Sequence, residues 1–166
     1  MPEGQLAETR GRHRWRRRIG IAVLALVVLF GLIQLIPYGH GGNPPVTKAA
    51  VWTNPHAHAL AKDSCYDCHS NLTKRWWGTR IAPASWLAES DVSGGRRALN
   101  FSEWDKPQAG VDEVIRAVQG GSMPPIQYKL IHGNSRLTAA ERQQLADGIR
   151  TLYATNPPAG IKHGDD

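Results

Sequence analysis

The sequence predicts a mainly α-helical protein, in which one N-terminal transmembrane helix precedes a small helical domain. Three observations support this class. The uncharged run Ile19–Ile36 follows an arginine-rich N-terminus, apolar residues recur at helical spacing in the second half of the chain, and no stretch alternates well enough to be a strand. The length of 166 residues suits one domain with additional segments.

The N-terminal part has the composition of an uncleaved membrane anchor. Residues 1–18 hold six arginines and two glutamates, and the run Ile19–Ile36, at about 1.5 Å per residue, nearly crosses a hydrocarbon core of roughly 30 Å. A cleaved signal peptide has a shorter apolar stretch and a small-residue cleavage site, which residues 36–39 do not provide. A buried core helix would not begin with six arginines. Because arginine stays inside, we expect a cytoplasmic basic tail at 1–18, a single-pass anchor at 19–36 in the cell (inner) membrane, and a periplasmic or extracellular remainder.

The formal net charge of +6 is concentrated at the N-terminus. Residues 1–18 account for +4 of it, as six arginines less two glutamates. The basic excess is therefore mostly a signal for membrane topology, and it also suits contact with anionic lipid headgroups. No basic stripe interleaved with aromatic residues follows, so we expect no nucleic-acid binding.

The rest of the chain divides into three segments. Residues 37–50, rich in proline and glycine, are expected to form a tether, the helical domain is expected at 51–155, and a flexible tail at 156–166. Thr138 and Glu141 form a capping box before the strongest predicted helix. The predicted helices of the domain are 55–63, with Asn54 as its N-cap, 84–91, 110–118 and 139–153. So thin a core would gain from a large apolar cofactor.

Both cysteines of the chain lie in the C-x-x-C-H motif Cys65–His69. Two thiols at this spacing can add across the two vinyl groups of a haem, and the histidine that follows can bind the iron. Three other uses of the two cysteines fit less well. A thiol–disulfide redox pair would normally follow a strand, and a structural disulfide would close too small a loop to stabilise the domain much. A zinc site would need two more ligands, and the spacing of His56 and His58 from the cysteines is unsuitable. We therefore expect one covalently attached haem c, with Cys65 and Cys68 as thioethers and His69 as the proximal iron ligand.

A second axial ligand is expected from Met123 in the segment "GGSMPP". Two glycines let the backbone approach the macrocycle, and Pro124 and Pro125 stiffen the chain behind the sulfur. A thioether ligand raises the redox potential relative to a second histidine. His132 is the alternative distal ligand, and Met123 could instead fill a gap in a core.

Aromatic and basic residues near the motif are candidates for the walls of the site. Trp76, Trp77 and Trp86 could cover the haem, as could Trp104, or they could form a plain aromatic core. Arg80 could reach a haem propionate or remain a solvated surface residue.

Several separated segments resemble the bacterial haem-binding domain family. They are "CYDCHSN", "RIAPASWL", "DVSGGRRALNFSEW", "GSMPPIQYKLIH" and "RLTAAER", within about residues 51–155. The resemblance implies a mainly helical, single-haem c-type cytochrome domain behind a membrane segment, with the haem held by Cys65–His69 and the Met-Pro-Pro loop on the distal side. The Tyr128 and His132 positions also belong to the family's motif. The segment "TKRWWGTR" departs from the resemblance, which implies a proline between the tryptophan and the next aromatic residue.

These expectations combine into a membrane-anchored monohaem cytochrome c that transfers single electrons on the extracytoplasmic side, in a respiratory chain. No nucleophile or acid–base pair is assembled, so we expect an electron-transfer protein and not an enzyme. The expected partners are membrane lipid and redox proteins, a respiratory complex among them. Two alternatives are a five-coordinate haem c that senses or binds a gas, and a fixed haem relay subunit of a larger membrane complex.

Overall fold

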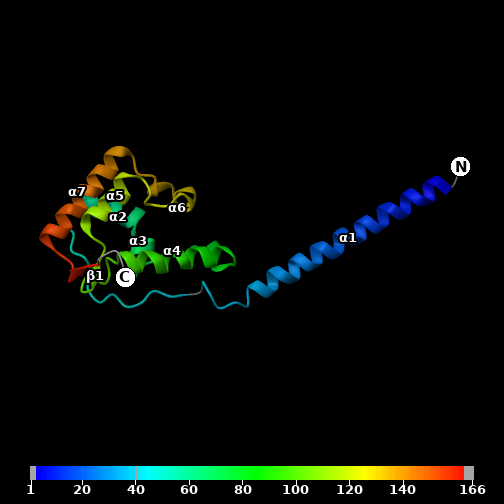
Figure 1. Ribbon diagram of the computed structural model, residues 1–166, viewed down its shortest axis with the longest axis horizontal. Helices are drawn as coiled ribbons and strands as arrows, with labels where there is room; N and C mark the ends of the chain where they lie inside the picture. Colours follow the sequence, from blue (N-terminus) through cyan, green and yellow to red (C-terminus); the bar gives the residue numbers. More distant parts are fainter. Residues whose placement is uncertain (1–2, 40, 163–166) are drawn as a thin grey trace.

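The computed structural model describes residues 3–39 and 41–162. A long helix, α1 (Glu3–Ile33), projects from a domain of shorter helices (Figure 1), and the described part of the chain is mainly helical, which confirms the predicted class in this respect. In those residues, strand structure is limited to β1 (Pro107–Gln108) and β2 (Gly160–Ile161) and one isolated bridge.

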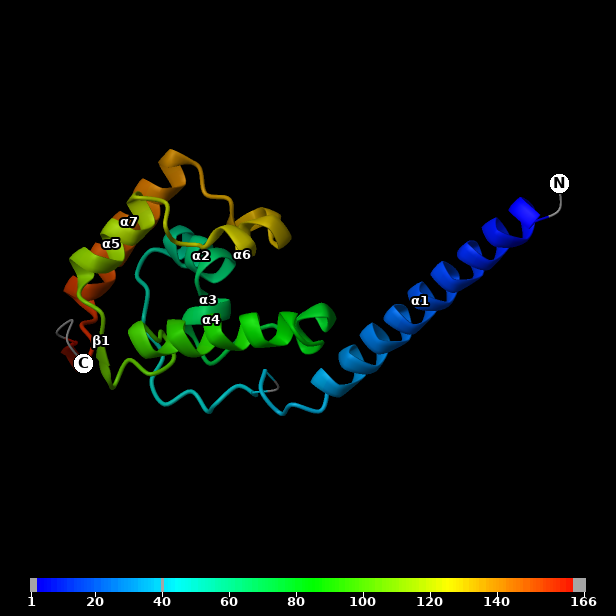
Figure 2. The ribbon, with the colours of Figure 1, turned by 45° about the vertical axis from the view of Figure 1, so that its right-hand side comes forward.

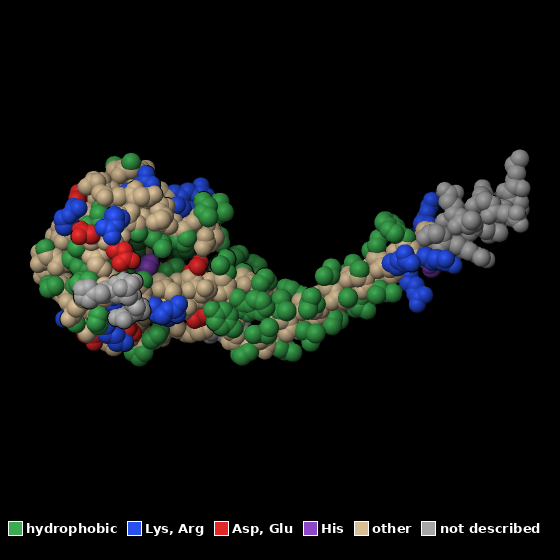
Figure 3. Space-filling model, in the orientation of Figure 1, with side chains coloured by type: hydrophobic (Ala, Val, Ile, Leu, Met, Phe, Trp, Pro, Cys, Tyr) green, Lys and Arg blue, Asp and Glu red, His purple; other side chains and the backbone are tan. Residues whose placement is uncertain are grey.

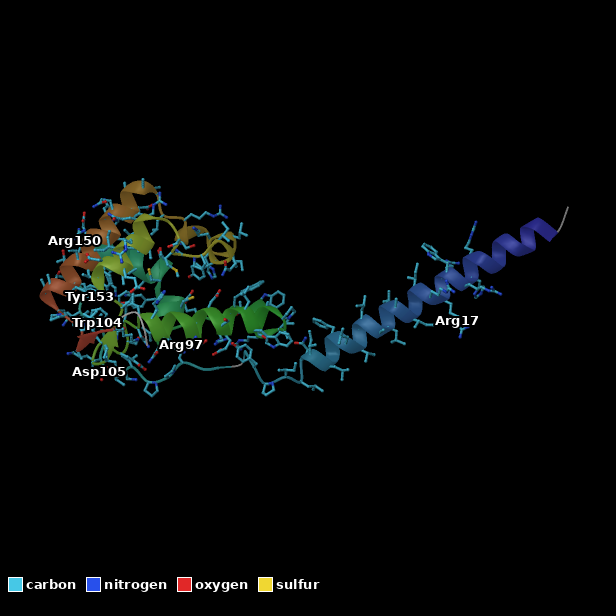
Figure 4. All side chains as sticks on the ribbon, viewed as in Figure 1. Arg17, Arg97, Trp104, Asp105, Arg150 and Tyr153 are labelled. Atoms are coloured by element: carbon cyan, nitrogen blue, oxygen red, sulfur yellow. The ribbon has the colours of Figure 1, made fainter. Side chains whose placement is uncertain are left out.

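Helix α1 joins the arginine-rich segment and most of the uncharged run into one rod. Figure 3 shows hydrophobic side chains along it and basic ones toward its far end, where Figure 4 labels Arg17. The helix ends at Ile33, short of Ile36, because Pro37 disfavours a helical conformation at the residue before it. Among the described residues, no helix combines the length and the hydropathy needed to cross a membrane. The prediction of a transmembrane helix at 19–36 therefore has no support from the structure.

The proline- and glycine-rich segment after α1 lies along the domain. The side chain of Asn43 exchanges two hydrogen bonds with the backbone of Thr73, at 3.0 and 3.2 Å. Farther on, the N–H of Ala50 donates to the carbonyl of Phe101 at 2.8 Å. The segment was predicted to be a tether, and its described residues are hydrogen-bonded to the domain because backbone groups that no helix satisfies find partners there.

The C-x-x-C-H motif lies between two helices of the domain. Helix α2 (Pro55–Ser64) begins as predicted after Asn54, whose side chain accepts hydrogen bonds from the first turn. Helix α4 (Ala84–Ala98) runs well past its predicted end, although Gly94 and Gly95 weaken an isolated helix, because α4 packs against the motif at Gly95. The short elements between them are α3 (Tyr66–His69) and the 3₁₀ helix η1 (Trp77–Arg80).

The second half of the domain is built from α5 (Val111–Gln119), α6 (Ile126–Ile131) and α7 (Ala139–Thr155). Helices α5 and α7 confirm the predicted ones, and the capping box is present, with the Glu141 carboxylate accepting from the Thr138 N–H at 2.8 Å. Helix α6 was not predicted, because its 6 residues are too few to reveal a helical period. A 3₁₀ turn, η2 (Gly133–Ser135), follows it.

The segment after α7 is bound to the domain up to the last described residue. Strand β2 pairs in parallel with β1, and the N–H of Lys162 donates to the carbonyl of Gln108 at 2.8 Å. These bonds hold a segment that was predicted to be flexible. Residues 163–166, the rest of that predicted tail, lie outside the described residues.

The core of the domain is built around a row of aromatic rings. Trp104 is fully buried and meets Tyr153 edge-on at a centroid distance of 5.3 Å, and Figure 4 shows the two side chains close together. Phe101 stacks between Trp104 and Tyr66, at 5.9 and 5.2 Å. The indole N–H of Trp104 donates to the carbonyl of Asn156 at 2.7 Å. Of the two interpretations of Trp104 from the sequence, the structure supports the aromatic core.

Helices α2 and α7 meet at Gly148, and this contact gives a first prediction. A Cβ added there would lie 2.2 Å from the Cβ of Ala57. We expect Gly148→Ala to lower the free energy of unfolding by about 1–3 kcal/mol, because the helices must separate. Adding Ala57→Gly to this variant removes the clash and is expected to restore part of the loss. Urea unfolding followed by circular dichroism measures both, and unchanged stability in Gly148→Ala would contradict the helix contact.

Candidate functional site

A cavity of about 260 Å³ opens beside the C-x-x-C-H motif. Its walls come from α3 and α4 on one side, and from α5 and the loop before α6 on the other. Cys65, Cys68, His69 and Met123 all line it, and most of the remaining lining is apolar. Figure 3 shows a hollow in the domain surface, with a histidine in it (purple). The fold therefore gathers two thiols, an imidazole and a thioether around one space.

The spacing of the motif is matched by a helical turn. The N–H groups of Cys68 and His69 both donate to the carbonyl of Cys65, at 3.1 and 2.8 Å. Residues three and four positions apart on a helix lie on one face. The two thiols and the imidazole are therefore presented to the same side, which is the side of the cavity.

His69 is oriented by the last turn of α4. Its Nδ1 lies 3.0 Å from the carbonyl oxygen of Gly95 and 3.0 Å from that of Leu99, so Nδ1 carries the proton and donates. The Nε2 lone pair is then left for a metal, since the described hydrogen bonds give that atom no protein partner. Burial lowers the pKa of His69, while the two backbone hydrogen bonds raise it. The net lowering keeps the imidazole neutral, the form that binds metals.

Close packing of α3 on α4 makes these hydrogen bonds possible. A Cβ at Gly95 would lie 2.5 Å from the carbonyl oxygen of Cys68, whereas a Cβ at Gly94 would meet nothing closer than 3.8 Å. Glycine at position 95 therefore lets the backbone of α4 approach the motif. The glycine pair inside a helix is the signal in the sequence that could have indicated this contact.

The two cysteines are free thiols in an apolar setting. Burial, and secondarily the neighbouring Cys68, raises the pKa of Cys65 to about 12. Burial raises the pKa of Cys68 to about 11, with a further contribution from Asp91. Redox-active cysteines have lowered pKa values, so these environments do not favour a thiol–disulfide redox pair.

Met123 reaches the cavity from the loop between α5 and α6. Its N–H donates to the carbonyl of Ala117 at 3.1 Å, which ties the loop to the end of α5. Gly121 makes the turn with a φ of 72°, a conformation that favours glycine. Pro124 and Pro125 continue the loop along the cavity wall.

Comparison with known families supplies the cofactor. Residues 28–151 match the family described as "Haem-binding domain". The chain belongs to this haem-binding family. Searches of curated proteins and of solved structures returned no significant match.

The residues around the cavity fit a haem. Its apolar walls suit a large flat macrocycle, and Cys65 and Cys68 lie at its edge, three positions apart. His69 offers Nε2 from one wall and Met123 lines the opposite one. These residues could coordinate a haem iron on one or both of its faces, and the apolar walls would keep water from it.

His132, the alternative distal ligand, does not line the haem cavity. It lies beside a second cavity of about 130 Å³ and stacks on Tyr128, with ring centroids 4.0 Å apart and planes at 16°. Tyr128 borders both cavities, and its hydroxyl donates to Oδ2 of Asp67 at 2.8 Å. Burial and the Asp67 carboxylate raise the pKa of Tyr128, so the phenol keeps its proton.

The tryptophans predicted as haem walls lie elsewhere, and so does the predicted propionate ligand. Trp76 and Trp77 are 50% and 66% exposed and pack on each other at the start of η1. Arg80 is exposed and lines a polar recess beside Gly39 and residues 41–43. Trp86 is partly buried and does not line the cavity. The reason is local, since the chain after the motif leads away from the cavity to the far end of α4 (Figure 2).

Two acidic residues of the haem cavity were not predicted. Asp91 from α4 and Glu113 from α5 both line it. Asp91 also accepts a hydrogen bond from the side chain of Gln127 at 3.2 Å. Neither residue lies near the motif in sequence, so only the packing of α4 and α5 could reveal them.

Proposed function

We propose that the protein is a monohaem c-type cytochrome that carries single electrons between partners. The observation that carries this proposal is the cavity shared by Cys65, Cys68 and His69, with all three on one face of a helical turn. Two thioether bonds keep a haem on a small domain. Bound haem supplies a one-electron couple at its iron, and the chain supplies the ligands, the apolar walls and the exclusion of water.

The lining of the cavity favours electron transfer over substrate chemistry. Apart from His69, the lining residues include no histidine, arginine or lysine. Asp91, Glu113 and Tyr128 also line the cavity and could move protons, but the proposed Met123 ligand leaves no open iron position beside them. We therefore propose no catalytic residue.

The proposal is tested on the full-length protein made in a host that matures c-type cytochromes. We expect the intact mass to rise by one haem and the haem to stay on the chain in a denaturing gel. The reduced spectrum should not change when carbon monoxide is added, because both axial positions are filled. A chain without added mass would contradict covalent attachment, and haem lost on denaturation would indicate a b-type site.

Replacing the proposed distal ligand gives a second prediction. We expect Met123→Ala to lower the midpoint potential and to open the iron to carbon monoxide, because a thioether ligand is lost. His132→Ala is the matched control, since His132 lies beside the other cavity. Redox titration and the near-infrared methionine–iron band of the oxidised protein measure the effect. A shift in His132→Ala alone would transfer the ligand role to His132.

A second candidate function rests on the exposure of Met123. Its side chain is 41% exposed, so it sits at the mouth of the cavity and not deep in the wall. A methionine that leaves the iron would give a five-coordinate haem, which senses or binds a gas. Rapid binding of carbon monoxide by the unaltered protein would favour this function over electron transfer.

We also propose that residues 19–36 anchor the chain to a membrane, with the N-terminus cytoplasmic and the haem domain on the other side. The arginines before residue 19 and the absence of charge up to Ile36 support this orientation. The uncharged helical part, Ile19–Ile33, is about 22 Å long, which is shorter than the hydrocarbon core of a bilayer. To cross that core, the chain would have to include Gln34–Ile36, the bilayer would have to thin locally, or the arginine side chains would have to extend to the headgroups. Redox partners in the same membrane, as in a respiratory chain, would then be within reach. Copurification in mild detergent distinguishes a free carrier from a fixed relay subunit.

A further inference from the structure

The exposed surface around Trp76 and Trp77 is not used by the haem site. We propose that this surface, which we call the apolar rim, docks on the lipid bilayer that holds α1. The rim is defined by its exposed hydrophobic side chains, which are Trp76, Trp77, Ile81, Leu87, Ile126, Leu130 and Ile131. The inference rests on the proposed membrane anchoring and extends it from the helix to the domain.

The rim is one continuous surface contributed by two parts of the chain. Its side chains are between 39% and 69% exposed. One part comes from η1 and the first turns of α4, and the other comes from α6. Leu87 and Ile131 line the second cavity together, so the two parts meet across it. Helix α6 offers three large apolar side chains to solvent within 6 residues, which a soluble domain rarely does without a partner.

The rim faces the side on which α1 leaves the domain. The Gln34 amide at the end of α1 donates to the carbonyl of Ala82 at 3.2 Å and accepts from its N–H at 3.0 Å. A Cβ at Gly39 would lie 2.7 Å from the backbone of Ser85, so the following chain presses on the first turn of α4. In Figures 1 and 2, α6 and the first turns of α4 lie toward α1. A bilayer that holds the apolar part of α1 is therefore next to the rim.

The charges around the rim match an anionic lipid surface. Lys74 and Arg80 are exposed on either side of the tryptophan pair. No aspartate or glutamate occurs from Lys74 to Ala88 or from Ile126 to Ala140, and Arg75 is already paired with Glu89. The second cavity, between the two parts of the rim, is lined by Asp67 and Asp91, which accept hydrogen bonds from Tyr128 and Gln127. Tryptophans beside cations are typical of the headgroup level of membranes, where the rings bury their apolar part and anionic lipids attract the charges.

The test uses the full-length haem protein in nanodiscs of phosphatidylcholine and phosphatidylglycerol, with single spin labels on introduced cysteines. Leu130→Cys reports on the rim, Leu26→Cys reports on α1, and Arg150→Cys is the aqueous control on the other side of the domain, as Figure 4 shows. For each label we measure the ratio of its collision rate with oxygen to its collision rate with a water-soluble nickel chelate. We expect this ratio to be several-fold higher for the labels at 26 and 130 than for the label at 150. Oxygen concentrates in the acyl region, so this ratio reports depth.

The outcomes separate the inference from the anchoring on which it rests. A label at 26 in the bilayer with a label at 130 in water overturns the docking and leaves the anchoring intact. A label at 26 in water overturns the anchoring. A label at 130 that is immobile but shielded from both collision partners means that a protein covers the rim, which also overturns the docking.

Charge reversal adds an independent readout. We expect Lys74→Glu with Arg80→Glu to move the label at 130 toward water in anionic discs, since each cation near such a surface contributes roughly a fivefold preference. Arg116→Glu with Arg150→Glu carries the same charge change on α5 and α7 and is expected to leave it in place. Equal effects of the two pairs would contradict a specific contact of the rim with lipid.

Discussion

Alanine in place of both Cys65 and Cys68 is expected to leave the domain without covalently held haem and close to unfolding. The haem cavity measures about 260 Å³ and opens between mostly apolar walls, which would face water if the haem were absent. The whole stability of a domain is only about 5–15 kcal/mol. The cofactor is therefore part of the core, and its loss is expected to abolish most of the cooperative thermal transition. Haem staining of a denaturing gel and calorimetry measure the two effects.

The single variants are the controls for this experiment. Cys65→Ala and Cys68→Ala each keep one thioether and the His69 imidazole, so we expect haem retention at reduced yield and an intermediate midpoint temperature. If the double variant kept its haem through acidic acetone extraction, attachment through these thiols would be excluded. If it lost the haem but unfolded as the parent does, the cavity would not depend on the cofactor for its stability.

The sequence predicted the parts of the fold that local chemistry determines. The Asn54 cap and the Thr138–Glu141 capping box each involve residues within three positions of one another, and both are present in the structure. The same holds for the turn from Cys65 to His69, whose spacing already implies a shared helical face. Local signals also indicated Met123, because glycines and prolines surround it.

The parts that were missed depend on packing between distant segments. Trp76, Trp77 and Arg80 lie within about ten residues of the motif, and nearness in sequence made them candidates for the haem walls. The walls come instead from α4 and α5, through residues such as Ala98 and Val118. The loop composition of residues 37–50 likewise says nothing about the partners that hold it to the domain. Contacts between segments far apart in sequence leave no local pattern.

Gly95→Ala is expected to destabilise the protein more than its neighbour Gly94→Ala does. Alanine inside a helix normally gains about 0.5–1 kcal/mol over glycine, and a Cβ at Gly94, which lines the haem cavity, would meet no protein atom closer than 3.8 Å. At Gly95 the new methyl group would lie 2.5 Å from the carbonyl oxygen of Cys68, which is backbone and cannot rotate away. Forcing α3 from α4 costs about 1–3 kcal/mol, which outweighs the gain in helix propensity. Urea unfolding of the two haem proteins measures the difference.

The same substitution tests how His69 is held. The carbonyls of Gly95 and Leu99 accept from Nδ1 of His69, so moving α4 weakens the hydrogen bonds that orient the imidazole. We therefore expect Gly95→Ala to shift the midpoint potential, and Ser93→Ala, on the same helix but outside the cavity lining, to leave it unchanged. A loss of stability without a shift in potential would show that α4 supports the fold but does not tune the ligand. Equal stability of the Gly94→Ala and Gly95→Ala variants would mean that α3 and α4 lie farther apart than the 2.5 Å between a Cβ at Gly95 and the carbonyl oxygen of Cys68 implies.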